Sequence, residues 1–201
     1  MREEVFYTQI PTEALQVSEQ ELAARLRTPI GYRDVRTDAL ETELKQTVQA
    51  AAVAVRFPIL KNEKNCITLP CFPIQSEVLA KHLQGCDSVY LMAVTLGMQT
   101  ERWLHRLSIL SPAKHFMADA IASAYAEAAA DYINAALAKD QALTNRFSPG
   151  YADLPLSVQP QLLSAVNANN YLHIMLNESL LMIPQKSITA IIGIRSEIGK
   201  E

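Results

Sequence analysis

The segment that offers the clearest chemistry is Arg146-Phe-Ser-Pro-Gly-Tyr151. The planar guanidinium of Arg146 can bind a carboxylate through two hydrogen bonds, and a hydrogen bond to a charged group contributes about 1.5–3 kcal/mol. Pro149 and Gly150 bend the chain, and the missing Cβ of Gly150 lets backbone groups approach a ligand. Tyr151 adds a flat apolar face with one polar end. The pattern predicts capture of a small anionic or zwitterionic ligand; the alternative is an ordinary turn whose arginine pairs with a nearby acid.

A second candidate lies on a predicted helix, in the stretch Ala126-Glu127-Ala-Ala-Ala-Asp131-Tyr132. Glu127 and Asp131 are four residues apart, so their side chains share one face of the helix. If this face lies near Arg146, Glu127 could balance a cationic centre of the ligand or bind a ribose hydroxyl group. The alternative is a solvated acidic stripe. Asp140, six residues before Arg146, is a further candidate acid.

Standard catalytic motifs are not found in the sequence. The four histidines form neither His-Glu-x-x-His nor His-x-x-x-His, and the chain has no Gly-x-Ser-x-Gly, Walker A or Gly-x-Gly-x-x-Gly motif. We therefore expect neither a zinc site nor a histidine-activated nucleophile. Each histidine is interpreted as an ordinary surface or core residue.

The composition is that of a folded protein without a strong charge bias. Of the 201 residues, 49% are hydrophobic and 19% are charged, so the chain can bury a core without disulfides or a structural metal. The formal net charge of −3 gives no general attraction to phosphate backbones or anionic lipids. The apolar runs are much shorter than the about 18 residues of a membrane span. Neither nucleic acid nor a membrane is therefore an expected partner.

The sequence favours a cytoplasmic location. The residues that follow Met1 include no apolar stretch typical of a secretory signal. Cys66, Cys71 and Cys86 are odd in number, and their spacing matches neither a disulfide framework nor a Cys-x-x-Cys pair. We expect a reducing compartment in which these thiols behave as small buried hydrophobic groups.

Hydrophobic periodicity and turn residues predict both helices and strands along the chain. The expected strands cover 5–10, 88–96, 174–182 and 187–194, with a hairpin formed by 57–60 and 66–70. The expected helices cover 19–27, 37–55, 76–83, 100–108, 112–139 and 157–167. Because the strands come in pairs rather than in βαβ alternation, the fold class predicted is α+β. We expect one domain over 1–201, with a twisted, mostly antiparallel sheet and flanking helices.

Several motifs, taken in order, resemble the reactivation (S-adenosylmethionine-binding) domain of cobalamin-dependent methionine synthase, and most closely its short stand-alone bacterial forms. Arg146, Gly150 and Tyr151 meet the family's Arg-x-x-x-Gly-Tyr signature. Leu176-Asn-Glu-Ser179 is similar to its Leu-Thr-Glu-Ser stretch, and Ala93-Val-Thr-Leu-Gly97 to its Ala-Val-Thr-Gly-Gly strand end. The sequence Ala-Glu-Ala around Glu127 falls at the matching point of a long helix.

The resemblance is clearest over 89–194 and departs from the family at specific points. Leu96 stands where the large enzyme has glycine, and Asn177 stands where it has threonine. Residues 1–85 show no clear match, so no ligand contact is transferred to them. The chain also lacks cobalamin, folate and homocysteine modules, so the resemblance implies work in partnership with a cobalamin-binding methionine synthase subunit.

The resemblance implies a curved, C-shaped molecule around a long central sheet, and a role in methyl transfer. The family holds S-adenosylmethionine over the cobalt of a partner's cobalamin while a flavodoxin-like or other one-electron reductant supplies an electron. This reductive methylation returns inactive cob(II)alamin to methylcobalamin. The chain would then be a methyltransferase component that is active only with its partner. Two alternatives stay open: a non-catalytic S-adenosylmethionine-binding or interaction module of another corrinoid system, and an α+β protein whose Arg146 turn is only structural.

The resemblance also implies roles for single residues in binding S-adenosylmethionine. Arg146 would bind the methionine carboxylate, Gly150 and Tyr151 would contact the adenosine region, and Glu127 would balance the cationic end. Pro149 and Glu178, which belong to the matched motifs, complete the predicted ligand-binding set. No residue is expected to act as a general base or nucleophile, because methyl transfer to a cobalt nucleophile needs neither.

Overall fold

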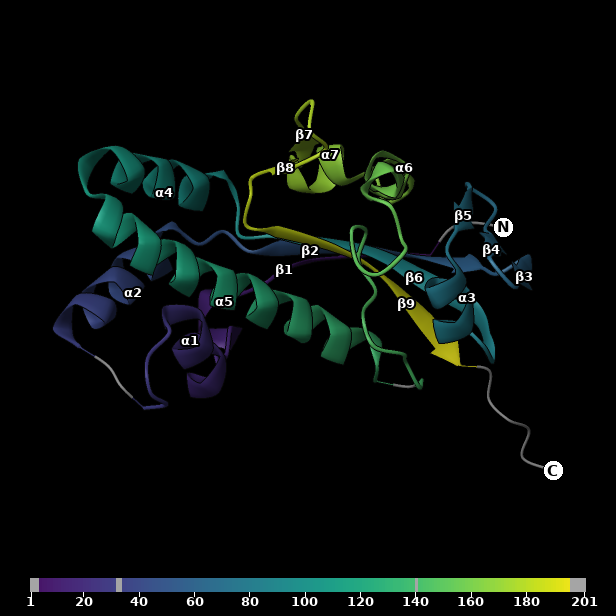
Figure 1. Cartoon of the computed structure of the whole chain (residues 1–201), viewed down its shortest axis with the longest axis horizontal. Coiled ribbons are helices and arrows are strands. Elements are labelled where there is room, and N and C mark those ends of the chain that lie inside the picture. The colour runs from purple at the N-terminus through teal and green to yellow at the C-terminus, as the bar shows by residue number, and fades with distance from the viewer. Residues whose placement is uncertain (1–3, 32–33, 140, 196–201) are drawn as a thin grey trace.

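The core of the molecule is an antiparallel sheet of four strands in the order β1-β2-β6-β9 (Figure 1). The computed structural model describes residues 4–31, 34–139 and 141–195. The four strands are β1 (Val5–Gln9), β2 (Ala51–Pro58), β6 (Cys86–Thr95) and β9 (Ser187–Arg195). Each neighbouring pair is antiparallel, and β9 pairs along β6 from Thr95↔Ser187 to Cys86↔Arg195.

Strands β2, β6 and β9 are buried on both faces, and the pleat divides their side chains between two cores. Ala52, Met92 and Val94 point to one face, and Val53 and Leu91 point to the other. The first face is covered by α1 (Glu19–Leu26), α2 (Val35–Thr47), α4 (Met98–Leu110) and α5 (Pro112–Leu137). The second face is covered by α3 (Glu77–His82), α6 (Gln159–Ala165) and α7 (Ala168–Leu172). Figure 1 shows α5 running along one side of the sheet and α6 and α7 on the other.

Short elements complete the described chain. Two one-turn helices are η1 (Thr12–Ala14) and η2 (Leu156–Val158). A small sheet joins β3 (Lys61–Glu63), β4 (Cys66–Thr68) and β5 (Pro73–Gln75), and a two-stranded hairpin joins β7 (Met175–Leu176) and β8 (Met182–Ile183).

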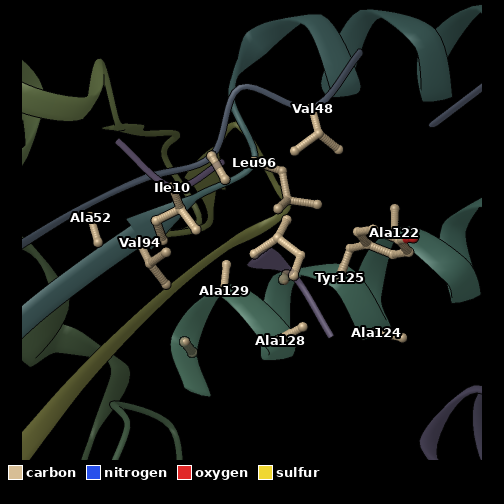
Figure 2. Packing of buried hydrophobic residues seen from close by; sticks show 14 of the residues in the cluster. Ile10, Val48, Ala52, Val94, Leu96, Ala122, Ala124, Tyr125, Ala128 and Ala129 are labelled. Carbon is tan, nitrogen blue, oxygen red and sulfur yellow. The ribbon is translucent and has the colours of Figure 1, made fainter. Parts of the chain in front are cut away.

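Helix α5 lies close to the sheet because its buried face is built mainly from alanine. Ala122 and Ala129 are fully buried, and Figure 2 shows this face packed beside Val94 and Leu96. Tyr125 is the large side chain in this region, and its hydroxyl donates to Glu41 Oε1 of α2 over 2.6 Å. Small side chains let the helix axis approach the sheet, so the polar residues on the helix flank are held at fixed positions beside β9.

The α+β class and the mostly antiparallel sheet predicted from the sequence are confirmed, but the helix expected over 37–55 is wrong. The helix ends at Thr47, the backbone is extended at Val48, and β2 begins at Ala51. The four-residue spacing of Leu40, Leu44, Val48 and Ala52 continues across this boundary by coincidence. Burial of successive residues on both sheet faces, which helical periodicity does not detect, makes residues 51–58 a strand.

Three smaller expectations also need correction. The strand expected over 174–182 is the hairpin β7–β8, whose turn forms because Asn177 Oδ1 accepts from the N–H groups of Ser179 and Leu181, each over 2.9 Å. The first strand of the expected hairpin at 57–70 is 61–63 rather than 57–60, because 57–58 extend β2. Ser157 makes no capping hydrogen bond, and α6 begins at Gln159.

The three cysteines are free, as expected, but they are not all buried. Cys71 is exposed, whereas Cys66 and Cys86 are half-buried. Burial raises the pKa of the Cys86 thiol, which keeps it neutral.

The outer edge of β9 is covered by the segment 142–147, which runs beside it as an irregular extra strand. Bridges join Leu143 to Ile194 and Phe147 to Ile191. Between them, the Thr144 N–H donates to the carbonyl oxygen of Gly193, and the Gly193 N–H donates to Thr144 Oγ1, each over 2.9 Å. An added Cβ at Gly193 would lie 2.6 Å from Cys86 Sγ, 2.7 Å from Leu83 Cδ2 and 2.9 Å from Thr144 Cγ2, so these side chains would have to shift to accommodate it.

We therefore expect Gly193→Ala to lower the free energy of unfolding by about 1–3 kcal/mol, the usual cost of overpacking a filled core. Urea denaturation of both proteins measures this difference. Thr144→Ser, which removes the crowded methyl group and keeps the hydroxyl, should recover part of the loss when combined with Gly193→Ala. Equal unfolding midpoints for the wild type and Gly193→Ala would contradict the packing described here.

Candidate functional site

The segment beside β9 directs Arg146 towards helix α5. Neighbouring residues of an extended segment point to opposite faces, and Phe147 is buried against Ile191 on the α6 side of the sheet. Arg146 therefore lies on the α5 side. Its Nη2 atom is 3.1 Å from Glu127 Oε2, and its Nη1 atom is 2.7 Å from Asp131 Oδ1. The fold thus brings together the two predicted constellations, which are 15–19 residues apart in sequence.

Glu127 lies between two guanidinium groups. Besides its contact with Arg146, its Oε1 atom is 3.7 Å from Nη2 of Arg25 in α1, and Arg25 also pairs with Glu21 over 2.9 Å. The side chain of Glu127 is 35% exposed, whereas that of Asp131 is 67% exposed. The Glu127 contact is therefore less screened by water than the Asp131 contact, and contributes more strongly to positioning the guanidinium.

Arg25 was missed by the sequence analysis. Its only local signal is the Glu21–Arg25 spacing of four residues, which is common on solvated helices. The contact with Glu127 depends on how α1 packs against α5, and that packing has no signature in the local sequence.

A pocket of 420 Å³ lies where α5, the segment 142–148 and β9 meet. It is lined by Glu127, Asp131, Asn134, Asn145, Arg146, Ser148 and Ile188. One guanidinium, two carboxylates, two side-chain amides and a hydroxyl group share this small volume, so the pocket can bind a small ligand that carries both charges. Asp140, the further candidate acid, lies outside the described residues.

The Pro-Gly turn predicted after Arg146 is present and follows the pocket directly. Pro149 and Gly150 are its central residues, the φ of Gly150 is +87°, and the N–H of Tyr151 donates to the carbonyl oxygen of Ser148 over 3.1 Å. This is the arrangement of a type II turn, in which glycine accommodates the positive φ. Tyr151 is exposed, and its ring lies edge-on to Phe147 at 5.4 Å between centroids. Pro149, Gly150 and Tyr151 do not line the 420 Å³ pocket.

Helix α3 holds the same loop from the other side. Asp153 caps this helix by accepting from Ser76 Oγ, from the Glu77 N–H over 2.7 Å and from the Val78 N–H over 3.3 Å. These hydrogen bonds, above all that from Ser76, hold the pKa of Asp153 below its ordinary value. His82, at the end of the helix, contacts the carbonyl oxygen of Asn145 through Nε2 over 2.8 Å. The loop that carries Arg146 is thus fixed at both ends.

Glu178 lies apart from this pocket. It is exposed, in the turn between β7 and β8, and it is not among the residues that line the pocket around Arg146. The structure therefore brings together Arg146 and Glu127 of the predicted set, with the turn residues beside them and Glu178 elsewhere.

A larger pocket of 690 Å³ lies where β1 and β6 end and β2 begins, and Tyr7, Gln49, Tyr171 and His173 are among its lining residues. None of its described lining residues is an aspartate, glutamate, lysine or arginine. Its described lining offers no lysine or arginine to pair with a carboxylate, so its volume does not make it the better candidate.

Two other features are not found among the described residues. Over 4–31, 34–139 and 141–195, no group of three or more histidine, cysteine, aspartate or glutamate side chains is arranged to hold a metal ion. In the same ranges, no helix has the length and apolar content to cross a membrane.

Comparison with known proteins identifies the family. Residues 12–198 match the model of a family described as "Vitamin B12 dependent methionine synthase, activation domain". The chain belongs to this family. The resemblance seen in the motifs is thereby confirmed. The activation-domain match also begins at residue 12, so the absence of a clear match before residue 86 in the sequence analysis is corrected.

The fold of this activation domain is also found in a solved structure, "Crystal Structure of the MetH Reactivation Domain bound to AdoHcy". The TM-score is 0.72 and the sequence identity is 15%, over 98% of this chain and 80% of that one. Comparison with curated proteins found no match.

The capping contact of Asp153 leads to a test by pH. Because its pKa is lowered in the folded protein, Asp153 stabilises the fold fully above the ordinary carboxyl value of 3.8, and this contribution disappears as the pH falls through the lowered value. At pH 7, Asp153→Ala should therefore unfold at a lower urea concentration than the wild type. The difference between the two urea midpoints should narrow below pH 4.

Glu63→Ala, which removes an exposed acid on β3, is the control and should show no comparable narrowing. A difference between the wild type and Asp153→Ala that stays constant or grows in acid would be incompatible with an ionised cap.

Proposed function

We propose that this activation domain works as a stand-alone, single-domain reactivation subunit for a cobalamin-dependent methionine synthase in the cytoplasm. It binds S-adenosylmethionine for the reductive methylation of cob(II)alamin carried by a partner protein. The observation that supports this most directly is the pairing of Arg146 with Glu127 and Asp131 in a pocket on the activation-domain fold. The structural neighbour, whose bound molecule is AdoHcy, supports the same class of ligand.

The ligand is proposed to bind by exchange of ion pairs. The methionine carboxylate takes the place of an acid on the Arg146 guanidinium, which matches a carboxylate in shape and charge. Glu127 and Asp131 then face the ammonium and sulfonium groups of the ligand. One guanidinium and two carboxylates give the pocket a net charge of −1, and the net charge of +1 on the ligand brings the total to zero, so binding leaves no charge unpaired.

The residues of this chain contribute position and charge, and the chemistry is supplied by the ligand and the partner's cofactor. An electron from a flavodoxin-like or other one-electron reductant and the methyl group of S-adenosylmethionine convert cob(II)alamin to methylcobalamin, leaving S-adenosylhomocysteine. A carboxylate at Glu127 favours the cationic methyl donor over the neutral sulfur of the product, and the effect grows as the docked partner excludes water. Methyl transfer to cobalt removes no proton, so the proposed mechanism needs no general base.

Arg146→Ala should weaken S-adenosylmethionine binding by about 10- to 150-fold, the equivalent of losing a hydrogen-bonded charge. Titration calorimetry measures this directly. Arg36→Ala is the matched control, because Arg36 pairs with Asp34 outside the pocket and its side chain is 78% exposed. The binding site proposed here is wrong if Arg146→Ala and Arg36→Ala bind with the same affinity.

A reconstitution assay separates reactivation from simple ligand binding. Inactive cobalamin protein, a one-electron donor and S-adenosylmethionine should regenerate the methylcobalamin absorption spectrum when the wild-type chain is added, and much more slowly with Arg146→Ala. A chain that binds S-adenosylmethionine but never restores the spectrum would instead be the non-catalytic module of another corrinoid system.

A further inference from the structure

The two carboxylate oxygens of Glu127 face two different guanidinium groups. Oε2 lies 3.1 Å from Nη2 of Arg146, which lines the same pocket, whereas Oε1 lies 3.7 Å from Nη2 of Arg25 on helix α1. The first distance is that of a hydrogen bond, and the second is that of an ion pair only. Arg146 therefore holds the carboxylate in the structure, and Arg25 is a second cation beside it.

Helix α1 fixes the position of Arg25 independently of the pocket. The buried side of this helix belongs to the core that it shares with α5. Arg25 Nε and Nη2 donate to Glu21 Oε1 over 3.1 and 2.9 Å, so the guanidinium is oriented from within its own helix. Its place beside Glu127 therefore does not depend on the contact between Glu127 and Arg146.

Exchange of ion pairs on Arg146 would break the shorter of the two contacts of Glu127. When a ligand carboxylate takes Arg146, Glu127 Oε2 loses its partner and faces the cationic end of the ligand. The side chain of Glu127 is only 35% exposed, so an unpaired carboxylate is costly there. Arg25 reduces this cost, because Oε1 needs to close only from 3.7 Å to about 2.9 Å to accept a charge-assisted hydrogen bond from it.

We infer that Arg25 is a positioning residue of this pocket, which acts through Glu127. It keeps the acid paired through Oε1 while Arg146 binds the ligand carboxylate, so Glu127 competes less strongly for Arg146. The inference rests on the proposed function, because it assumes that a ligand carboxylate takes Arg146. The alternative is that Arg25 and Glu21 form an ordinary surface pair of α1 with no effect on the pocket.

The test is a double-mutant cycle on the binding of S-adenosylhomocysteine, which has the same carboxylate as S-adenosylmethionine but an uncharged sulfur. By titration calorimetry, Arg25→Gln should bind it about three- to fivefold more weakly than the wild type, the effect of a partly exposed ion pair. In the Glu127→Gln background no competing carboxylate is left, so Arg25→Gln should change the affinity by less than about twofold.

Two further variants separate the charge of Arg25 from its role in helix α1. Arg25→Lys keeps a cation beside Glu127 and should recover most of the lost affinity. Glu21→Gln, the matched control, removes the other partner of Arg25 and should bind S-adenosylhomocysteine as the wild type does. Thermal melting without ligand checks that each variant is folded, and Arg25→Met, which keeps an apolar stem, replaces Arg25→Gln in the cycle if Arg25→Gln does not fold.

A purely structural role of Arg25 predicts the same loss of affinity with and without the Glu127 carboxylate. Equal losses in the two backgrounds, or no loss in either, overturn the inference and leave the proposed function standing. Failure of the folded wild type to bind S-adenosylhomocysteine overturns both, because the pocket is proposed to recognise the amino-acid end that this compound shares with S-adenosylmethionine.

Discussion

The structure of the site depends on one ion-pair cluster, in which Arg146 joins two carboxylates of helix α5. Arg146 can reach them only because the segment 142–147 lies along the outer edge of β9 and buries Phe147 on the opposite side of the sheet. That docking in turn needs the bare backbone of Gly193, and the alanine face of α5 brings the helix close enough for the contact. Sheet, loop and helix therefore converge on a single guanidinium, and the position of each constrains the others.

This cluster also links the beginning of the chain to the pocket. Arg25 lies 3.7 Å from Glu127, so helix α1 contributes a second positive charge beside the acid that would face the methyl donor. On the other side of the sheet, α3 fixes the same loop through Asp153 and His82. Residues 1–85, for which the sequence alone offered no ligand contact, thus help to hold the Arg146 loop and the acid beside it in place.

The sequence predicted the parts of the structure that local patterns determine. The i,i+4 spacing placed Glu127 and Asp131 on one face, and Pro149 with Gly150 predicted a turn because each residue restricts the backbone in a known way. Features set by long-range packing were not predictable. One example is the end of α2 at Thr47, because the four-residue spacing of apolar residues continues past this point into strand β2. The contact between Arg25 and Glu127 is another, since it depends on how α1 packs against α5. Glu178 was chosen from its motif alone, and its ligand contact stays a prediction.

The most direct test of the central claim is a crystal structure of this chain with S-adenosylmethionine bound. The account predicts ligand density between α5 and the segment 142–148, with the methionine carboxylate within hydrogen-bond distance of the Arg146 guanidinium and Glu127 turned towards the sulfonium. Density in the 690 Å³ pocket beside Tyr7 and Tyr171, with the contacts of Arg146 to Glu127 and Asp131 unchanged, would contradict it.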